Sequence, residues 1–92
     1  MMMHAQSVTF SEHSMTVWRD DGRVLTVPLA WYPRLLHGTS QARARYELIG
    51  DGEGIHWPDL DEDISVEGLI AGRRSAETHG SLSRWLAKRP QD

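Results

Sequence analysis

Residues 15–27 read MTVWRDDGRVLTV, and this stretch decides the fold class. It holds two runs in which apolar and polar residues alternate, Met15–Arg19 and Arg23–Val27, with Asp20-Asp21-Gly22 between them. An Asp-Gly pair between two alternating runs is a strong signal for a β-hairpin, because the central positions of a tight hairpin turn need positive φ angles. The sequence therefore predicts two antiparallel strands joined through Gly22.

The alternation also predicts which hairpin side chains are buried, since successive side chains on a strand point to opposite faces. Trp18 then lies on the face opposite the core. Pro28 ends the second strand of the hairpin, because proline has no N–H to give to the ladder. The expected buried face consists of four apolar residues: Met15, Val17, Leu25 and Val27.

The residues that flank the hairpin predict one strand before it and two short helices after it. Ser7–Phe10 alternates like a short strand. Residues 29–37 are typical of a short helix with Pro33 in its first turn, where a missing N–H costs little. Thr39 or Ser40 can cap a second short helix. Helices this short must pack on the sheet to be stable.

The middle of the chain predicts two more strands. Tyr46–Ile49 and Gly54–Trp57 are strand-like, and the link over residues 50–53 has the chemistry of a turn. Pro58 closes the later strand. The sequence thus predicts five strands in all, with short helices between and after them.

These elements predict a small single α+β domain, in which a mainly antiparallel sheet packs with short helices. We expect residues 7–72 to form the compact domain. We expect residues 73–92 to form a basic C-terminal tail with a short amphipathic helix over residues 82–89, capped by Ser81.

The composition excludes several classes of protein. A chain of 92 residues is one small domain with a thin margin of stability. Without cysteine it has no disulfide framework, no thiolate metal site and no Cys nucleophile. No apolar run approaches the roughly 20 residues that span a bilayer, and the N-terminus lacks the pattern of a signal peptide. We expect a cytoplasmic protein without membrane contact.

The net charge of −3 hides an asymmetry along the chain. Residues 1–71 carry five arginines against eleven carboxylates, a net charge of −6, and residues 72–92 carry five basic residues against two carboxylates, a net charge of +3. An acidic body with a basic tail suggests contact with a charged partner.

Five segments of the chain carry a family resemblance. They are residues 21–23 (DGR), 27–35 (VPLAWYPRL), 45–50 (RYELIG), 54–58 (GIHWP) and 61–69 (DEDISVEGL). Over about residues 7–72 the chain resembles the bacterial family of domains of unknown function numbered 2442, and its tail is similar to a common extension of that family.

The resemblance implies a compact α+β domain with no established enzyme activity, and it supplies no catalytic residues that could be assigned to this chain. We expect no cofactor. Members often sit beside small genes of another uncharacterised family, in a layout that looks like a toxin–antitoxin pair. Some longer members end in a helix-turn-helix, for which this chain is too short after Gly72.

The acidic run after residue 58 is the first candidate site. Asp59, Asp61 and Asp63 match positions one, three and five of a calcium-binding loop. The sixth position of that loop needs glycine and the twelfth a bidentate glutamate, but Ile64 and Ile70 stand there. The sequence therefore excludes a calcium hand.

Two other readings of the acidic run stay open. A less constrained site for Mg²⁺, Mn²⁺ or a transition metal would use His56 with two or three of the carboxylates. Alternatively, the acids of residues 61–63 precede a helix over residues 66–71, favour the positive end of its dipole, and leave Asp63 or Ser65 as the cap. One cap does not use four acids, so the surplus predicts a solvated face or a basic partner.

His56 and Trp57 should point to opposite faces of their strand. Trp57 is expected in the core or as a lid over it. A catalytic His56 would need a placed nucleophile and an orienting partner, and the sequence supplies neither. We expect a hydrogen-bonded or exposed structural histidine.

The sequence thus favours a non-enzymatic protein-interaction module, antitoxin-like or regulatory, whose partner is a neighbouring gene product or a second copy. The alternative is a DNA-contacting autoregulator that uses the basic tail, with weak nucleic-acid contact, and a lower alternative is a metal-dependent enzyme around His56 and the acids. The expected interaction surface consists of Trp31, Tyr32, Arg34, His56, Asp59, Asp61, Glu62 and Asp63. The expected tail contacts are Arg73, Arg74, Arg84, Trp85, Lys88 and Arg89.

Overall fold

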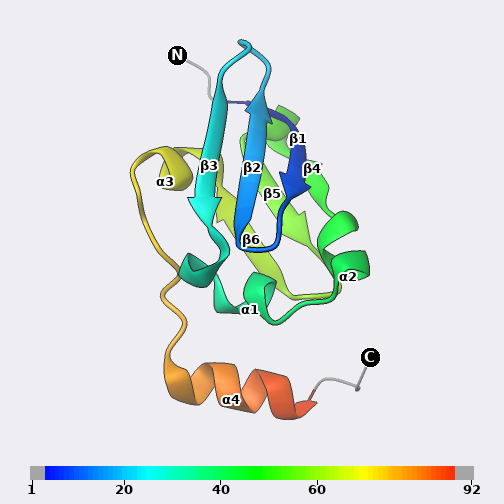
Figure 1. Ribbon diagram of the computed structural model, residues 1–92, viewed down its shortest axis with the longest axis vertical. Coiled ribbons are helices and arrows are strands. Elements are labelled where there is room, and N and C mark those ends of the chain that lie inside the picture. Colours follow the sequence, from blue (N-terminus) through cyan, green and yellow to red (C-terminus); the bar gives the residue numbers. More distant parts are fainter. Residues whose placement is uncertain (1–3, 89–92) are drawn as a thin grey trace.

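Two three-stranded antiparallel sheets form the body of the protein, and the computed structural model describes residues 4–88 (Figure 1). The strands are β1 (Ala5–Phe10), β2 (Ser14–Arg19), β3 (Val24–Pro28), β4 (Glu47–Ile49), β5 (Gly54–Trp57) and β6 (Glu62–Ser65). The helices are η1 (Leu29–Trp31), α1 (Pro33–Leu36), α2 (Ser40–Ala44), η2 (Gly50–Gly52), α3 (Val66–Ile70) and α4 (His79–Lys88). The predicted α+β class and antiparallel pairing are confirmed, with the strands divided between two sheets in the orders β1-β2-β3 and β4-β5-β6.

The predicted hairpin is the pair β2–β3. The Arg19 N–H donates to the Arg23 carbonyl at 2.9 Å, which leaves a three-residue loop between them. Only Gly22 in that loop has a positive φ, at 89°, as expected for a three-residue hairpin loop with one residue in the left-handed region. Met15, Val17 and Val27 are buried and Leu25 is half-buried, whereas Trp18 is 45% exposed, so the predicted faces are confirmed.

A sixth strand, β6, replaces the expected direct approach to a helix. The chain turns after Trp57, whose carbonyl accepts the Leu60 N–H at 3.2 Å, and Asp61 adopts a φ of 51°. Aspartate tolerates this left-handed conformation better than most residues. Ile64 then pairs with Ile55 of β5, which places both in the core. The short alternation around one apolar residue gave too weak a strand signal in the sequence.

The core lies between the sheets and is centred on Trp57, which is fully buried, as predicted. The indole N–H donates to the Arg43 carbonyl at 3.0 Å, and the Phe10 ring meets the indole edge to face at 6.4 Å between centroids. The two sheets are also joined by a hydrogen bond from the Val8 N–H to the Tyr46 hydroxyl at 3.1 Å.

Side-chain caps begin three of the helices. Thr39 accepts the Ala42 N–H before α2, and Ser65 accepts the Gly68 N–H before α3. Helix α4 starts at His79, earlier than expected, so Ser81 is not its cap. Thr78 and Ser81 instead bond to each other's backbone N–H, at 3.0 and 3.1 Å, in the manner of a capping box.

Helix α4 lies below the two sheets in Figure 1, at the end of an extended segment. It buries no residue fully, although Leu82 and Trp85 are half-buried. Within residues 4–88, no helix has both the length and the apolar character needed to cross a bilayer.

Candidate functional site

Three of the four acids of the run pair with a basic side chain within the chain. Asp59 pairs with Arg45 at 3.2 Å and Asp61 with Arg34 at 3.4 Å. None of the acids caps α3, because that cap is Ser65. The expectation that Asp63 or Ser65 caps the helix is therefore resolved in favour of serine, and the acids belong to the β5–β6 hairpin.

His56 and Asp63 form one cross-strand pair of that hairpin. They face each other on β5 and β6, and Nδ1 of the imidazole lies 2.5 Å from Oδ1 of the carboxylate. The ring is about one-third exposed and the carboxylate 69% exposed, so the pair lies on the outer face of the sheet. No hydroxyl nucleophile bonds to the other ring nitrogen among residues 4–88. The pair is a structural surface contact in this conformation.

Glu62 lies on the opposite face of β6 from Asp63. Glu62 lies on the core-facing side of the strand with the buried Ile64, and it is half-buried. Burial raises the pKa of the Glu62 carboxyl, against the opposing effects of its hydrogen bond from the Asp63 N–H and of the Arg34 charge. Burial of Tyr32 raises the pKa of its hydroxyl, and the nearby Glu62 charge raises it further.

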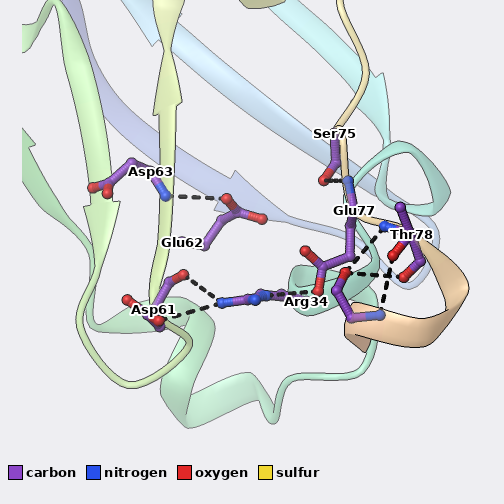
Figure 2. Close-up of polar contacts among 8 residues, drawn as sticks. Arg34, Asp61, Glu62, Asp63, Ser75, Glu77 and Thr78 are labelled. Carbon is purple, nitrogen blue, oxygen red and sulfur yellow. Dashed lines mark hydrogen bonds and ion pairs between the residues drawn. The ribbon is translucent and has the colours of Figure 1, made fainter. Parts of the chain in front are cut away.

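Arg34, near the start of α1, joins the acidic turn to the tail (Figure 2). Its Nε donates to Oε1 of Glu77 at 3.0 Å, and its Nη1 donates to the Asp61 carbonyl at 2.9 Å. The guanidinium also lies 5.1 Å from the centre of the Trp85 ring. Because Arg34 and Glu77 are only 18% and 13% exposed, this contact fixes the tail to the body.

The aromatic edge of the expected surface is divided between core and surface. Tyr32 is buried, and its hydroxyl donates to the Arg73 carbonyl at 2.8 Å. Trp31 is half-buried beneath the guanidinium of Arg74, 4.9 Å from the ring centre. Trp31 therefore keeps part of its ring at the surface, whereas Tyr32 holds the tail segment in place.

The basic tail contributes separate side chains rather than one patch. Arg73 and Arg74 lie on the segment between α3 and α4, and Arg84 and Lys88 lie exposed on α4. Arg89, the last expected tail contact, lies outside the described residues. The only aromatic of this set, Trp85, packs against the core and against Arg34.

The candidate metal ligands do not converge. Within residues 4–88, no three His, Asp or Glu side chains come close enough to hold a metal ion together. His56 and Asp63 face one side of the second sheet and Glu62 the other, which separates the donors that the sequence places side by side. The structure gives the metal-dependent alternative no ligand set in this region.

A cleft of about 220 Å³ lies between β6–α3 and the segment of residues 73–76. Its lining includes Tyr32, Glu62, Ser65, Gly68, Arg73 and Ser75. No local sequence pattern connects these residues, because the cleft depends on how the segment after α3 folds back. The clearest sequence signal was Glu62, a charged residue that alternates in register with Ile64.

The outer face of the first sheet is a second feature that the sequence analysis missed. Cross-strand pairing aligns one row of Ser7, Trp18 and Val24 and another of Thr9, Thr16 and Thr26, with Ser14 and Pro28 beyond them. No side chain in these rows is charged. The indole N–H of Trp18 donates to Oγ1 of Thr9, and Thr16 bonds to Thr26. The strand alternation that placed Trp18 outside also predicts this uncharged face.

Comparison with known proteins places this geometry among proteins without an assigned activity. The sequence profile described as "Protein of unknown function (DUF2442)" matches residues 5–75. No curated protein matches the chain. The chain is similar to the crystal structure of a protein of unknown function from Rhodospirillum rubrum, with 24% identity and a TM-score of 0.69, over 87% of this chain and 96% of that one.

A second solved structure has the same fold. It is the solution NMR structure of an uncharacterized protein from Chromobacterium violaceum, with 24% identity and a TM-score of 0.68. The match covers 95% of this chain and 76% of that chain. At this level of identity the two structures establish the fold alone.

Proposed function

The chain belongs to the family described as "Protein of unknown function (DUF2442)", and from that premise we propose that the protein is a non-enzymatic protein-interaction module. Its finer role in this proposal is that of an antitoxin-like or regulatory partner of a neighbouring gene product. That role rests on the family resemblance, and the structure supports the broader role of an interaction module.

The observation that carries the proposal is the uncharged outer face of the β1–β3 sheet. In Figure 1 this face looks toward the viewer, with the second sheet behind it, and none of the described helices crosses in front of it. Trp18 is 45% exposed and Val24 is 47% exposed, side by side on neighbouring strands. Charged residues make up 25% of the chain, so a sheet face without any is a marked local depletion.

This composition suits protein contact for a physical reason. Burying an unpaired charge at an interface is costly, whereas the threonine hydroxyls and the Trp18 N–H of this face already bond to one another and lose less when water leaves. Trp is also among the residue types that dominate binding energy at interfaces. The centre of such an interface would lie at Trp18, with the threonine row beside it.

The acidic edge, by which we mean Asp59, Asp61 and Asp63, is a weaker docking surface in this proposal. Asp59, Asp61 and Asp63 already have partners within the chain, so a basic partner would have to displace Arg45, Arg34 or His56. Exposed ion pairs contribute about 0–1 kcal/mol each, so exchange is feasible but gains little. We therefore assign the acidic edge a secondary role in orienting the partner.

The test is co-purification with the tagged product of the neighbouring gene. We expect a stable complex that Trp18→Arg abolishes, because the new charge would be buried at the interface. The matched control is Ile70→Arg, since Ile70 is 41% exposed and lies on α3, away from this face. Failure of the wild-type proteins to co-purify, or equal loss with both variants, contradicts the antitoxin-like role.

Sedimentation of the protein alone distinguishes the other occupant of this face, a second copy. A two-fold dimer places the same patch against itself, and an uncharged patch can do so without repulsion between like charges. A dimer that Trp18→Arg dissociates supports the interaction module with a homo-oligomeric partner. A strict monomer without any complex rules out both.

The DNA-contacting alternative keeps one supporting observation, the exposure of Arg84 and Lys88 on α4. Helix α4 has ten residues and one of its sides packs on the body, so only the basic side is available. A gel shift on the protein's own promoter tests this alternative. Unchanged retardation after Arg84→Gln with Lys88→Gln would exclude contact through this helix.

A further inference from the structure

The cleft beside β6 is preformed by backbone hydrogen bonds. The Arg73 N–H donates to the Gly68 carbonyl at 2.9 Å, and the Ser75 N–H donates to the Trp31 carbonyl at 3.0 Å. Together with the bond from the Tyr32 hydroxyl to the Arg73 carbonyl, these contacts hold the segment of residues 73–76 as a fixed wall. A ligand would therefore meet a site that is already ordered.

Glu62 brings unused hydrogen-bonding capacity into this cleft. Its only hydrogen bond among residues 4–88 comes from the neighbouring Asp63 N–H, at 3.1 Å to Oε1. An ionised carboxylate has about four acceptor positions. Figure 2 shows the Glu62 side chain extending from β6 toward the segment that carries Ser75 and Glu77. Arg34, whose charge acts on the Glu62 carboxyl, donates its hydrogen bonds to other acceptors.

The charges around Glu62 favour a cationic group. The negative charges of Glu77 and Asp63 act on the Glu62 carboxyl, and among residues 4–88 the one positive charge that does so is Arg34. An ammonium group placed against Glu62 would complete its hydrogen bonding and balance the local charge. Charge-assisted hydrogen bonds of this kind are the strong ones.

Arg73 brings the opposite charge to the same cleft. Its guanidinium is exposed and has no ion pair or hydrogen bond with any residue of the described chain. Arg74, the second arginine of the lining, is held over Trp31. The lining of the cleft thus includes one carboxylate, Glu62, and one guanidinium, Arg73, and among residues 4–88 the two groups do not pair with each other.

This arrangement selects between classes of ligand. A simple cation would be repelled by Arg73 and Arg74, and a simple anion by Glu62 and Glu77. The volume of about 220 Å³ is small, since sites for drug-sized ligands measure about 300–1,000 Å³. We propose that the cleft binds a free α-amino acid, whose ammonium group contacts Glu62 and whose carboxylate contacts Arg73.

The other lining groups fit such a ligand. Tyr32 adds an aromatic residue to the lining, and the Ser65 hydroxyl accepts the Gly68 N–H while its own proton stays available for a carboxylate. This site lies on β6 and α3, away from the outer face of the first sheet. The proposal is therefore independent of the proposed protein contact, and either can fail without the other.

The test is titration of the ¹⁵N-labelled protein with each standard L-amino acid at millimolar concentration, followed by amide chemical shifts. We expect saturable shifts at residues 62–76 for at least one amino acid. The best ligand is then compared with its amide, which lacks the carboxylate, and with its N-acetyl form, which lacks the ammonium. Each analogue should bind about ten-fold or more weakly, because one charge-assisted contact is lost.

Two variants assign the contacts. Glu62→Gln and Arg73→Gln should each weaken binding by about ten-fold or more. Glu67→Gln on the exposed side of α3 and Arg84→Gln on α4 are the matched controls, and both should bind like the wild type. The absence of saturable shifts with every amino acid overturns the proposal. The proposal is also overturned if both analogues bind as tightly as the amino acid, or if both cleft variants bind it as tightly as the wild type does.

Discussion

The outer faces of the two sheets differ in the charge of their side chains. On the first sheet, cross-strand pairing aligns Thr9, Thr16 and Thr26 in one row and brings Trp18 beside Val24. On the second sheet, the corresponding row is Glu47, His56 and Asp63. Directly opposite residues of antiparallel strands share a face. The outer face of the first sheet is therefore uncharged in both rows, whereas that of the second carries this charged row beside an uncharged one of Ile49, Gly54 and Ser65.

The difference in charge indicates which sheet is better suited to contact another molecule. The charged row is compatible with water, because its groups are hydrated and partly paired. The uncharged rows of the first sheet lose less when water is removed, so this face is the better candidate for a permanent contact. The two sheets also differ in the burial of their tryptophans: Trp18 of the first sheet is 45% exposed, whereas Trp57 of the second is fully buried.

The largest expected effect comes from exchanging those tryptophans for alanine. Trp57→Ala removes a fully buried ring that also holds the Arg43 carbonyl, and it should cost about 3–5 kcal/mol of unfolding free energy. Trp18→Ala removes a half-exposed ring and should cost less than about 1 kcal/mol. Urea unfolding of the two variants measures both. Similar costs would mean that Trp18 belongs to the fold rather than to a contact surface.

The next largest effect is expected from removing the charge of the largely buried Arg34–Glu77 ion pair. Arg34→Ala leaves Glu77, 13% exposed, without its partner, and should cost about 1–3 kcal/mol. Amide exchange should become faster in α4 while β2 stays protected, because Arg34 links the tail to the body. Arg34→Lys keeps the charge but not the forked geometry, and should restore only part of the protection. Unchanged exchange in α4 would show that Trp85 alone holds the helix.

Much of this fold could be predicted from local sequence signals, and the missing parts have physical causes. The hairpin through Gly22 was predictable because turn chemistry and alternation agree over a long stretch. Strand β6 was not, because four acids hid a pairing that becomes visible only when Ile64 meets Ile55. The carboxylates were expected at a helix N-terminus, and three of them are instead taken up by Arg45, Arg34 and His56.

The candidate sites were less predictable than the fold, for a related reason. The cleft joins Glu62 to Arg73 through a segment that folds back after α3, and no local pattern encodes that return. The uncharged face was within reach, since alternation already placed Trp18 outside the core. Its other residues are neighbours of Trp18 across the strands rather than along the chain, so strand pairing is needed to bring them together.

A smaller effect concerns Glu62, the one acid of the run that points toward the core side. Burial raises its pKa above the ordinary value of 4.5, so the folded state favours the protonated carboxyl. Its contribution to stability is fully present below pH 4.5 and is lost as the pH rises through the raised value. Glu62→Gln should therefore become more stable than the wild type toward neutral pH, by up to about 0.5 kcal/mol.

Thermal unfolding between acid and neutral pH measures this difference. Glu67→Gln is the control, because Glu67 is exposed on α3, and its difference from the wild type should stay constant over the same range. A Glu62→Gln variant that loses stability toward neutral pH would mean that the carboxylate has a cationic partner in the folded protein.

The smallest effect is expected on the charged row itself. Asp63→Asn removes the contact with His56, but both side chains are partly hydrated, so the cost should be about 0.2–1 kcal/mol. A double-mutant cycle with His56→Ala measures the coupling, which should shrink further in high salt. Thr16→Ala on the uncharged row is the counterpart, and it loses only the hydroxyl contact with Thr26. A coupling energy well above this range would mean that the charged row stabilises the fold. The two faces would then differ in their hydration and not in how much their side-chain contacts stabilise the protein.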